Sequence, residues 1–138
     1  MISSHTMGKN HYICASSCLF LIPSFLSRLI KNNILAYSGI VTTIVSINYW
    51  RNIEHGFRRE LDLYCSRFMC VICSSYYLRY SDNIYDIFLF CFLGKFLYFL
   101  YINGDFTKEK WYLYHITFHF ILMLSGTLTV YKMKRYVI

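Results

Sequence analysis

The sequence is poor in charge, proline and glycine. Only 15% of its 138 residues are charged, and it contains one proline and six glycines. A soluble domain carries about 25% charged residues, and disordered or collagen-like chains need far more proline, glycine or charge. These shortages exclude a disordered chain, a collagen-like repeat and an ordinary soluble globule. No polar segment exceeds about a dozen residues, which leaves no room for a soluble catalytic domain.

Apolar and aromatic residues are abundant instead. They include 14 Tyr and 12 Phe, apolar residues make up 57% of the chain, and the mean hydropathy is +0.38. This composition predicts an integral membrane protein in contact with a lipid bilayer. The net charge of +7 does not indicate nucleic-acid binding, because the Lys and Arg residues are scattered between apolar runs. The six Cys lie in apolar stretches, where Cys usually packs as a small hydrophobe.

A transmembrane helix needs about 20 mainly apolar residues, and several stretches of the chain meet this length. The expected spans are residues 34–50, 61–80, 84–102 and 111–131, preceded by a further candidate at 12–30. The further candidate contains Pro23 and could also be an interfacial helix or a signal sequence. The short connections favour antiparallel neighbours. We therefore predict an all-α bundle of four or five transmembrane helices, forming one membrane domain over residues 1–138.

The flanking residues support these boundaries but give no orientation. Basic residues divide evenly between the two sides, so the positive-inside rule favours neither. Aromatic residues near the expected span ends are typical of the belt at a membrane interface. They are Tyr12, Tyr49, Trp50, Tyr80, Tyr101, Trp111, Tyr112 and Tyr131.

Five of the ionisable residues inside the expected spans are candidates for a functional role. They are Asp62, Arg67, Lys95, His115 and His119. Each such group costs roughly 2.5–3.5 kcal/mol at a helix centre on insertion scales. We therefore expect each to face the bundle interior or an aqueous cavity, or to extend toward the interface.

The order of the spans brings several polar residues into one half of the bilayer. Ser46 lies near the end of one span, Asp62 near the start of the next, and His115 and His119 near the start of the last. His115 and His119 are four residues apart and share one helix face, a spacing that suits two nitrogens on one metal ion. The alternative is a pair of interhelical hydrogen bonds, for instance to Ser46 or Tyr49.

A second metal site would combine the histidine pair with Cys70 and Cys73. Two Cys and two His are a known structural zinc set. The long separation along the chain between Cys73 and His115 does not fit a zinc finger, so this site is not expected.

Three segments together resemble the CREST superfamily, which joins alkaline ceramidases, hemolysin III-like proteins and progestin/adipoQ receptors. They are residues 46–50 (SINYW), 59–62 (RELD) and 115–119 (HITFH). The resemblance implies a membrane zinc site with three His ligands and, in the enzyme members, hydrolysis of a lipid amide. By position, His115 and His119 would be ligands and Asp62 would orient or deprotonate the water. Ser46 would help to hold the developing oxyanion.

The chain departs from the family pattern at one ligand. Trp50 stands where the first His ligand is expected, and indole cannot ligate zinc. His55 could substitute, or Asp62 could itself complete a site of two histidines and one carboxylate. The family typically has seven spans, more than the number predicted for this chain.

Three functions follow from these patterns. The favoured one is a small integral membrane protein with a CREST-like core that is not catalytic as it stands. The second is a zinc-dependent membrane hydrolase acting on ceramide-like lipid amides. The third is a pore- or assembly-forming protein, including a homo-oligomer, because Arg67 and Lys95 lie at membrane depth.

Overall fold

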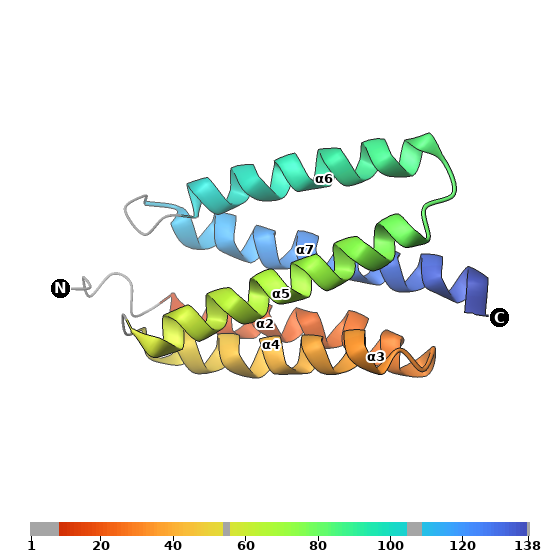
Figure 1. The fold of residues 1–138 in the computed structure, drawn as a ribbon. Helices are drawn as coiled ribbons and strands as arrows, with labels where there is room; N and C mark the ends of the chain where they lie inside the picture. The colour runs from red at the N-terminus through yellow and green to blue at the C-terminus, as the bar shows by residue number, and fades with distance from the viewer. Residues whose placement is uncertain (1–8, 54–55, 105–108, 138) are drawn as a thin grey trace.

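The structure is a computed structural model that describes residues 9–53, 56–104 and 109–137. Every regular element in these ranges is a helix, so the predicted all-α class is confirmed. The elements are α2 (Asn10–Ser17), η1 (Cys18–Phe20), α3 (Leu21–Leu29), α4 (Asn33–Arg51), α5 (Phe57–Arg79), α6 (Ile84–Asn103) and α7 (Trp111–Val137). Figure 1 shows the long helices running along one common direction, with α6 at the edge of the bundle beside α7.

The first three elements form one continuous helical rod, residues 10–29, which we call the N-terminal rod. Its middle turn, η1, is a 3₁₀ helix that lies just before Pro23. Proline has no N–H to donate, and its ring clashes with the carbonyl group four residues earlier, so the α-helical ladder is interrupted there. The rod therefore continues through the tighter 3₁₀ turn.

Small side chains bring the N-terminal rod close to both of its neighbours. On α4, a Cβ atom added to Gly39 would collide with the Ser24 hydroxyl. On α7, a Cβ atom added to Gly126 would lie 3.1 Å from the Cβ of Pro23. Ser24 and Ser27 are buried and donate to the carbonyl groups of Phe20 and Pro23, at 2.7 and 2.6 Å. The rod is thus enclosed between α4 and α7.

The reversal between α3 and α4 is short because both helix ends are closed locally. Lys31 adopts the left-handed conformation, with φ of 60°. The Asn32 amide then donates to the Ser27 carbonyl at 2.9 Å, which satisfies a free acceptor at the end of α3. The Asn32 side chain accepts from the Leu35 amide at 3.0 Å and so caps α4.

Two ion pairs join the start of α6 to the end of α7. Lys132 lies 2.6 Å from the Asp86 carboxylate, and Arg135 lies 3.6 Å from that of Asp82. The Lys132 ammonium also lies over the Tyr77 ring, 5.3 Å from its centroid. These contacts accompany the continuation of α7 beyond the predicted end at residue 131.

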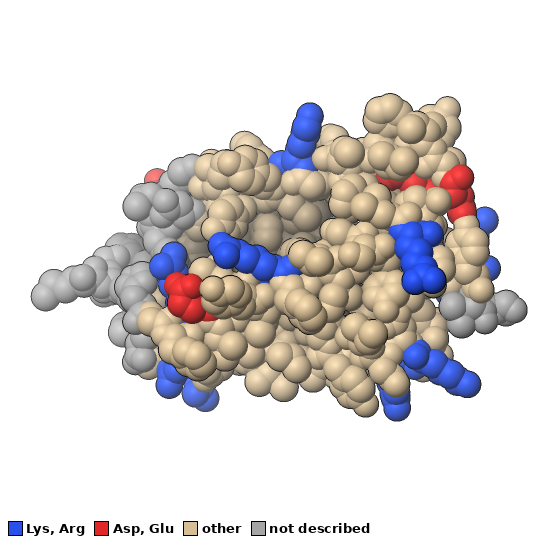
Figure 2. Space-filling view, in the orientation of Figure 1, with Lys and Arg blue, Asp and Glu red and all other residues tan. Residues whose placement is uncertain are grey.

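In the part of the chain that the structure describes, three helices are long and apolar enough to cross a membrane, consistent with an integral membrane protein that contacts lipid. They are residues 10–29, 84–103 and 111–136. The predicted spans 34–50 and 61–80 form α4 and α5, but neither helix qualifies by composition. Serine, threonine and asparagine lower the mean hydropathy of α4. Helix α5 begins with a charged stretch and carries two further Arg. The candidate at 12–30 qualifies. Figure 2 shows the surface to be mostly uncharged along the helices.

Three of the expected interfacial aromatic residues belong to the core instead. Tyr49, Trp50 and Trp111 pack with Ile13 in one buried cluster. They lie at the helix ends where an aromatic belt is expected, but their rings face other helices. For these three, position along the helix was a poor guide to exposure.

Adding a methyl group tests the close packing of the rod. Gly39→Ala should be about 1–3 kcal/mol less stable than Gly94→Ala, because a Cβ at Gly94 meets only open space. Both changes give an α-helix the same propensity gain, so their difference reports packing alone. Unfolding of the purified chain in mild detergent measures it. Equal stability of the two variants would contradict the packing at Gly39.

Candidate functional site

The two histidines of α7 lie one turn apart on the inner side of the helix. The ring centroids of His115 and His119 are 4.7 Å apart. His119 is buried, with 4% of its surface exposed, and the edge of the Phe20 ring contacts it at a centroid distance of 4.9 Å. The shared helix face predicted from the spacing of the two residues therefore turns toward the N-terminal rod.

Ser16 of α2 makes the interhelical hydrogen bond to this pair. Its Oγ lies 2.8 Å from Nδ1 of His119 and 2.9 Å from the carbonyl oxygen of Ile13. A hydroxyl group has one proton, so when Ser16 donates to Ile13, the imidazole Nδ1–H donates to Ser16. The partner expected for the histidines was Ser46 or Tyr49, whereas for His119 it comes from the N-terminal rod.

Ser17, the next residue of the rod, contacts a predicted site residue of α4. Its Oγ lies 3.3 Å from Oγ of Ser46 on α4, and Ser46 is a hydrogen-bonding neighbour of the Asp62 carboxylate on α5. Asp62 is 7% exposed, and its Oδ1 has no hydrogen-bond partner. Four helices thus meet in one buried polar cluster. Its members are Ser16, Ser17, Ser46, Asp62 and His119.

Trp50 packs directly against the other histidine. The indole and imidazole centroids of Trp50 and His115 are 4.5 Å apart, with the rings at 61° to each other. On its other side the indole stacks on Trp111, at 6.0 Å. An indole has an N–H donor and no lone pair in the ring plane for a metal. The space beside His115 is therefore filled by a ring that cannot ligate zinc.

The side chains present do not fit a zinc ion. Within residues 9–53, 56–104 and 109–137, no group of three or more His, Cys, Asp or Glu could hold a metal ion. His55, the suggested substitute ligand, lies outside the described residues. Asp62 has Ser46 as its neighbour and forms no metal-binding group with the two histidines.

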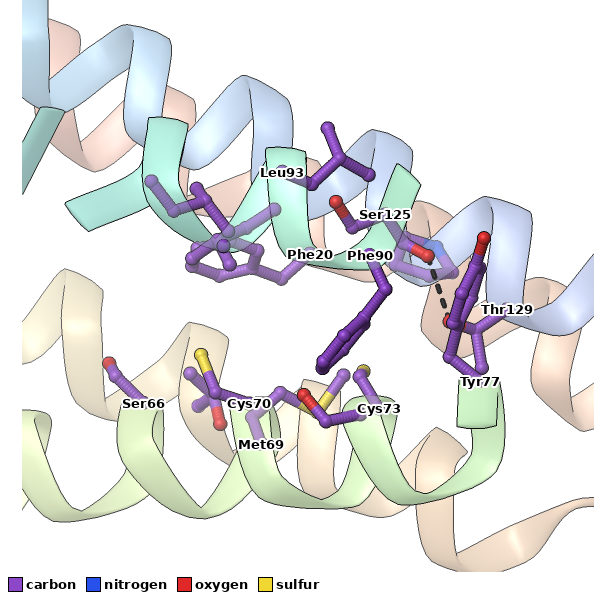
Figure 3. Close-up of a pocket in the computed structure, with 16 residues that line it drawn as sticks. Phe20, Ser66, Met69, Cys70, Cys73, Tyr77, Phe90, Leu93, Ser125 and Thr129 are labelled. Carbon is purple, nitrogen blue, oxygen red and sulfur yellow. Dashed lines mark hydrogen bonds between the residues drawn. The ribbon is translucent and has the colours of Figure 1, made fainter. Parts of the chain in front are cut away.

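Cys70 and Cys73 line an apolar cavity, and they form no metal-binding group with the histidines. The cavity has a volume of about 260 Å³ and lies among α5, α6, α7 and the N-terminal rod, as Figure 3 shows. The Ser125 hydroxyl on its wall is buried and has no hydrogen-bond partner. Its mainly hydrocarbon lining suits an apolar occupant.

The remaining two predicted site residues lie outside this interior. Arg67 on α5 and Lys95 on α6 are both exposed, so neither faces the bundle core. The sequence analysis also missed Ser16 and Ser17. The sequence pattern that could have found them is a row of residues at helical spacing, which continues through Phe20 to Ser24 and Ser27. All of these residues are buried in the structure.

Comparison with known proteins does not extend these observations. No family model, no curated protein and no solved structure matches the chain.

A double-mutant cycle tests the hydrogen bond between α2 and α7. Ser16→Ala and His119→Phe should couple by about 0.6 kcal/mol, and by no more than about 1.7 kcal/mol, the range for such bonds in membranes. Chemical unfolding in detergent measures the coupling. Ser75→Ala serves as the control partner, because Ser75 is exposed and bonds only within its own helix. A coupling of zero for Ser16 would contradict the contact.

Proposed function

We propose that this chain is a non-catalytic integral membrane protein with a CREST-like core. In this proposal all five long helical segments, the N-terminal rod and α4 to α7, cross the bilayer. The polar residues of α4 and the acidic group of α5 are then buried against other helices rather than against lipid. The buried positions of Thr42, Ser46 and Asp62 support this arrangement.

The packing of Trp50 against His115 carries the non-catalytic part of the proposal. A hydrolytic site would need a third donor and an open position for water beside the histidines. The indole takes up that space and supplies no lone pair. Ser16 and Phe20 enclose His119 from the rod, so both imidazoles are held by contacts within the protein.

The buried polar cluster then acts in helix association. In a bilayer there is no hydrophobic force between helices, so close packing and interhelical hydrogen bonds decide which helices pair. The cluster joins α2, α4, α5 and α7 through side chains that have no water to bond. Its role is to select this one arrangement of the helices.

Zinc content tests this proposal. The full chain, purified in mild detergent and equilibrated with excess zinc, should hold no stoichiometric zinc by elemental analysis. Trp50→His should increase the zinc content, because it restores an imidazole beside His115 in the order of the family pattern. Trp50→Phe is the matched control, since it also reduces the ring but adds no ligand.

One tightly bound zinc per chain in the unmodified protein would contradict the proposal and favour the hydrolase. Release of fatty acid from a ceramide probe, lost in His119→Ala, would contradict it as well. An unmodified chain without zinc that leaves ceramide intact is the expected result.

A further inference from the structure

The single cation of α6, Lys95, lies near the middle of the helix. Lys95 is the only Lys or Arg between Ile84 and Asn103, and it precedes Asn103 by eight residues. At 1.5 Å per residue this places it about 12 Å from that end of the helix. Half of a hydrocarbon core is about 15 Å. Lys95 is therefore close to the middle of the bilayer if α6 crosses it.

The side chain of Lys95 points away from the rest of the protein. The inner face of α6 carries the residues that line the apolar cavity, namely Phe90, Leu93, Gly94 and Leu97. Lys95 is exposed, and the helical repeat of 3.6 residues per turn places it on the opposite face. Only 6% of the apolar stretch of α6 is buried inside the protein.

Phenylalanine residues share the helix face of this cation. Phe88, Phe92 and Phe99 share its helix face at intervals of three or four residues, and all three are more than half exposed. The rings of Phe92 and Phe99 each stack on Phe96 at 6.5 Å. We call Phe88, Phe92, Lys95 and Phe99 the outer face of α6. It is an apolar aromatic surface with one positive charge at its centre.

Among the residues that the structure describes, no acidic side chain pairs with Lys95. The ion pair of α6 in this part of the chain is that of Asp86 with Lys132, and Asp82, just before α6, pairs with Arg135. Of the seven acidic residues, the structure describes Glu60, Asp62, Asp82, Asp86 and Glu109, and each lies between helices or within about two turns of a helix end. None of these five lies at the depth of Lys95. A second copy of the chain would therefore bring another ammonium group to this depth and no carboxylate.

We propose that the outer face of α6 binds a transmembrane helix of another protein that carries an Asp or Glu near the middle of its span. Ionisable side chains inside membranes almost always pair with one another or face a protein interior. A carboxylate at the same depth would bond the ammonium without the side chain having to extend toward the lipid headgroups. The neighbouring phenylalanines supply the apolar contact for a helix. This inference does not depend on the polar cluster or on zinc.

Synthetic peptides provide the probe. Leucine-rich transmembrane peptides with a central Asp, Asn or Leu would be mixed with the full-length chain in phosphatidylcholine vesicles, and energy transfer between labels would report association. The Asp peptide should associate about tenfold more tightly than the Leu peptide. The Asn peptide separates charge pairing from simple hydrogen bonding and should bind distinctly more weakly than the Asp peptide.

Substitutions locate the contact. Lys95→Leu should reduce binding of the Asp peptide to the level of the Leu peptide, because the exposed side chain contributes nothing to the core. Arg67→Leu is the matched control, since it removes an exposed cation from the middle of a different helix, α5, and should leave the preference unchanged. An unchanged thermal unfolding curve confirms that each variant is folded.

Four results with the peptides would overturn the proposal. They are equal binding of the Asp and Leu peptides, full binding to Lys95→Leu, loss of the preference in Arg67→Leu, and loss of the preference when phosphatidylserine is added, which would indicate lipid as the partner. Self-association of the chain that disappears in Lys95→Leu would favour a second copy and overturn it as well.

Discussion

The close packing of the N-terminal rod is the contact on which the rest of the structure depends. Ser24 and Pro23 lie against Gly39 and Gly126, which sets the distance from the rod to α4 and α7. At that distance Ser16 and Ser17 reach His119 and Ser46. A larger side chain along this seam would separate the helices and leave those polar groups without partners. Inside a bilayer no water could replace them.

The same packing determines which groups contact the histidine pair. The spacing of His115 and His119 is compatible with metal binding, but their surroundings come from other helices. Ser16 bonds one ring and Trp50 covers the other. Both histidines are thus held by contacts with other helices. A CREST-type zinc site would have to break these contacts. Arg67 and Lys95 are both exposed on the outside of the bundle, and the partner contact proposed above is at Lys95.

The sequence predicted the helices well and their surroundings poorly. Apolar run length gave all five long helical segments to within a few residues at most ends, because helices in a bilayer must satisfy their own backbones. Run length did not show that α4 and α5 fall short by composition, because it took no account of polar residues such as Thr42, Ser46 and Asp62, which are buried between helices. The order of Ser46, Asp62 and the histidines indicated one shared site. The contribution of Ser16 and the position of the Trp50 ring depend on packing between distant segments, which spacing along one helix does not contain.

The most direct test of this account is the contact between Trp50 and His115 in a membrane. Solid-state NMR of the chain, with labelled histidine and tryptophan in lipid vesicles, measures the proximity of the two rings and the state of both imidazoles. The account predicts that the indole and imidazole remain in contact, at a centroid distance of 4.5 Å, and that added zinc leaves the imidazole nitrogen shifts unchanged. Zinc-bound shifts at His115 and His119, with the indole displaced, would contradict it.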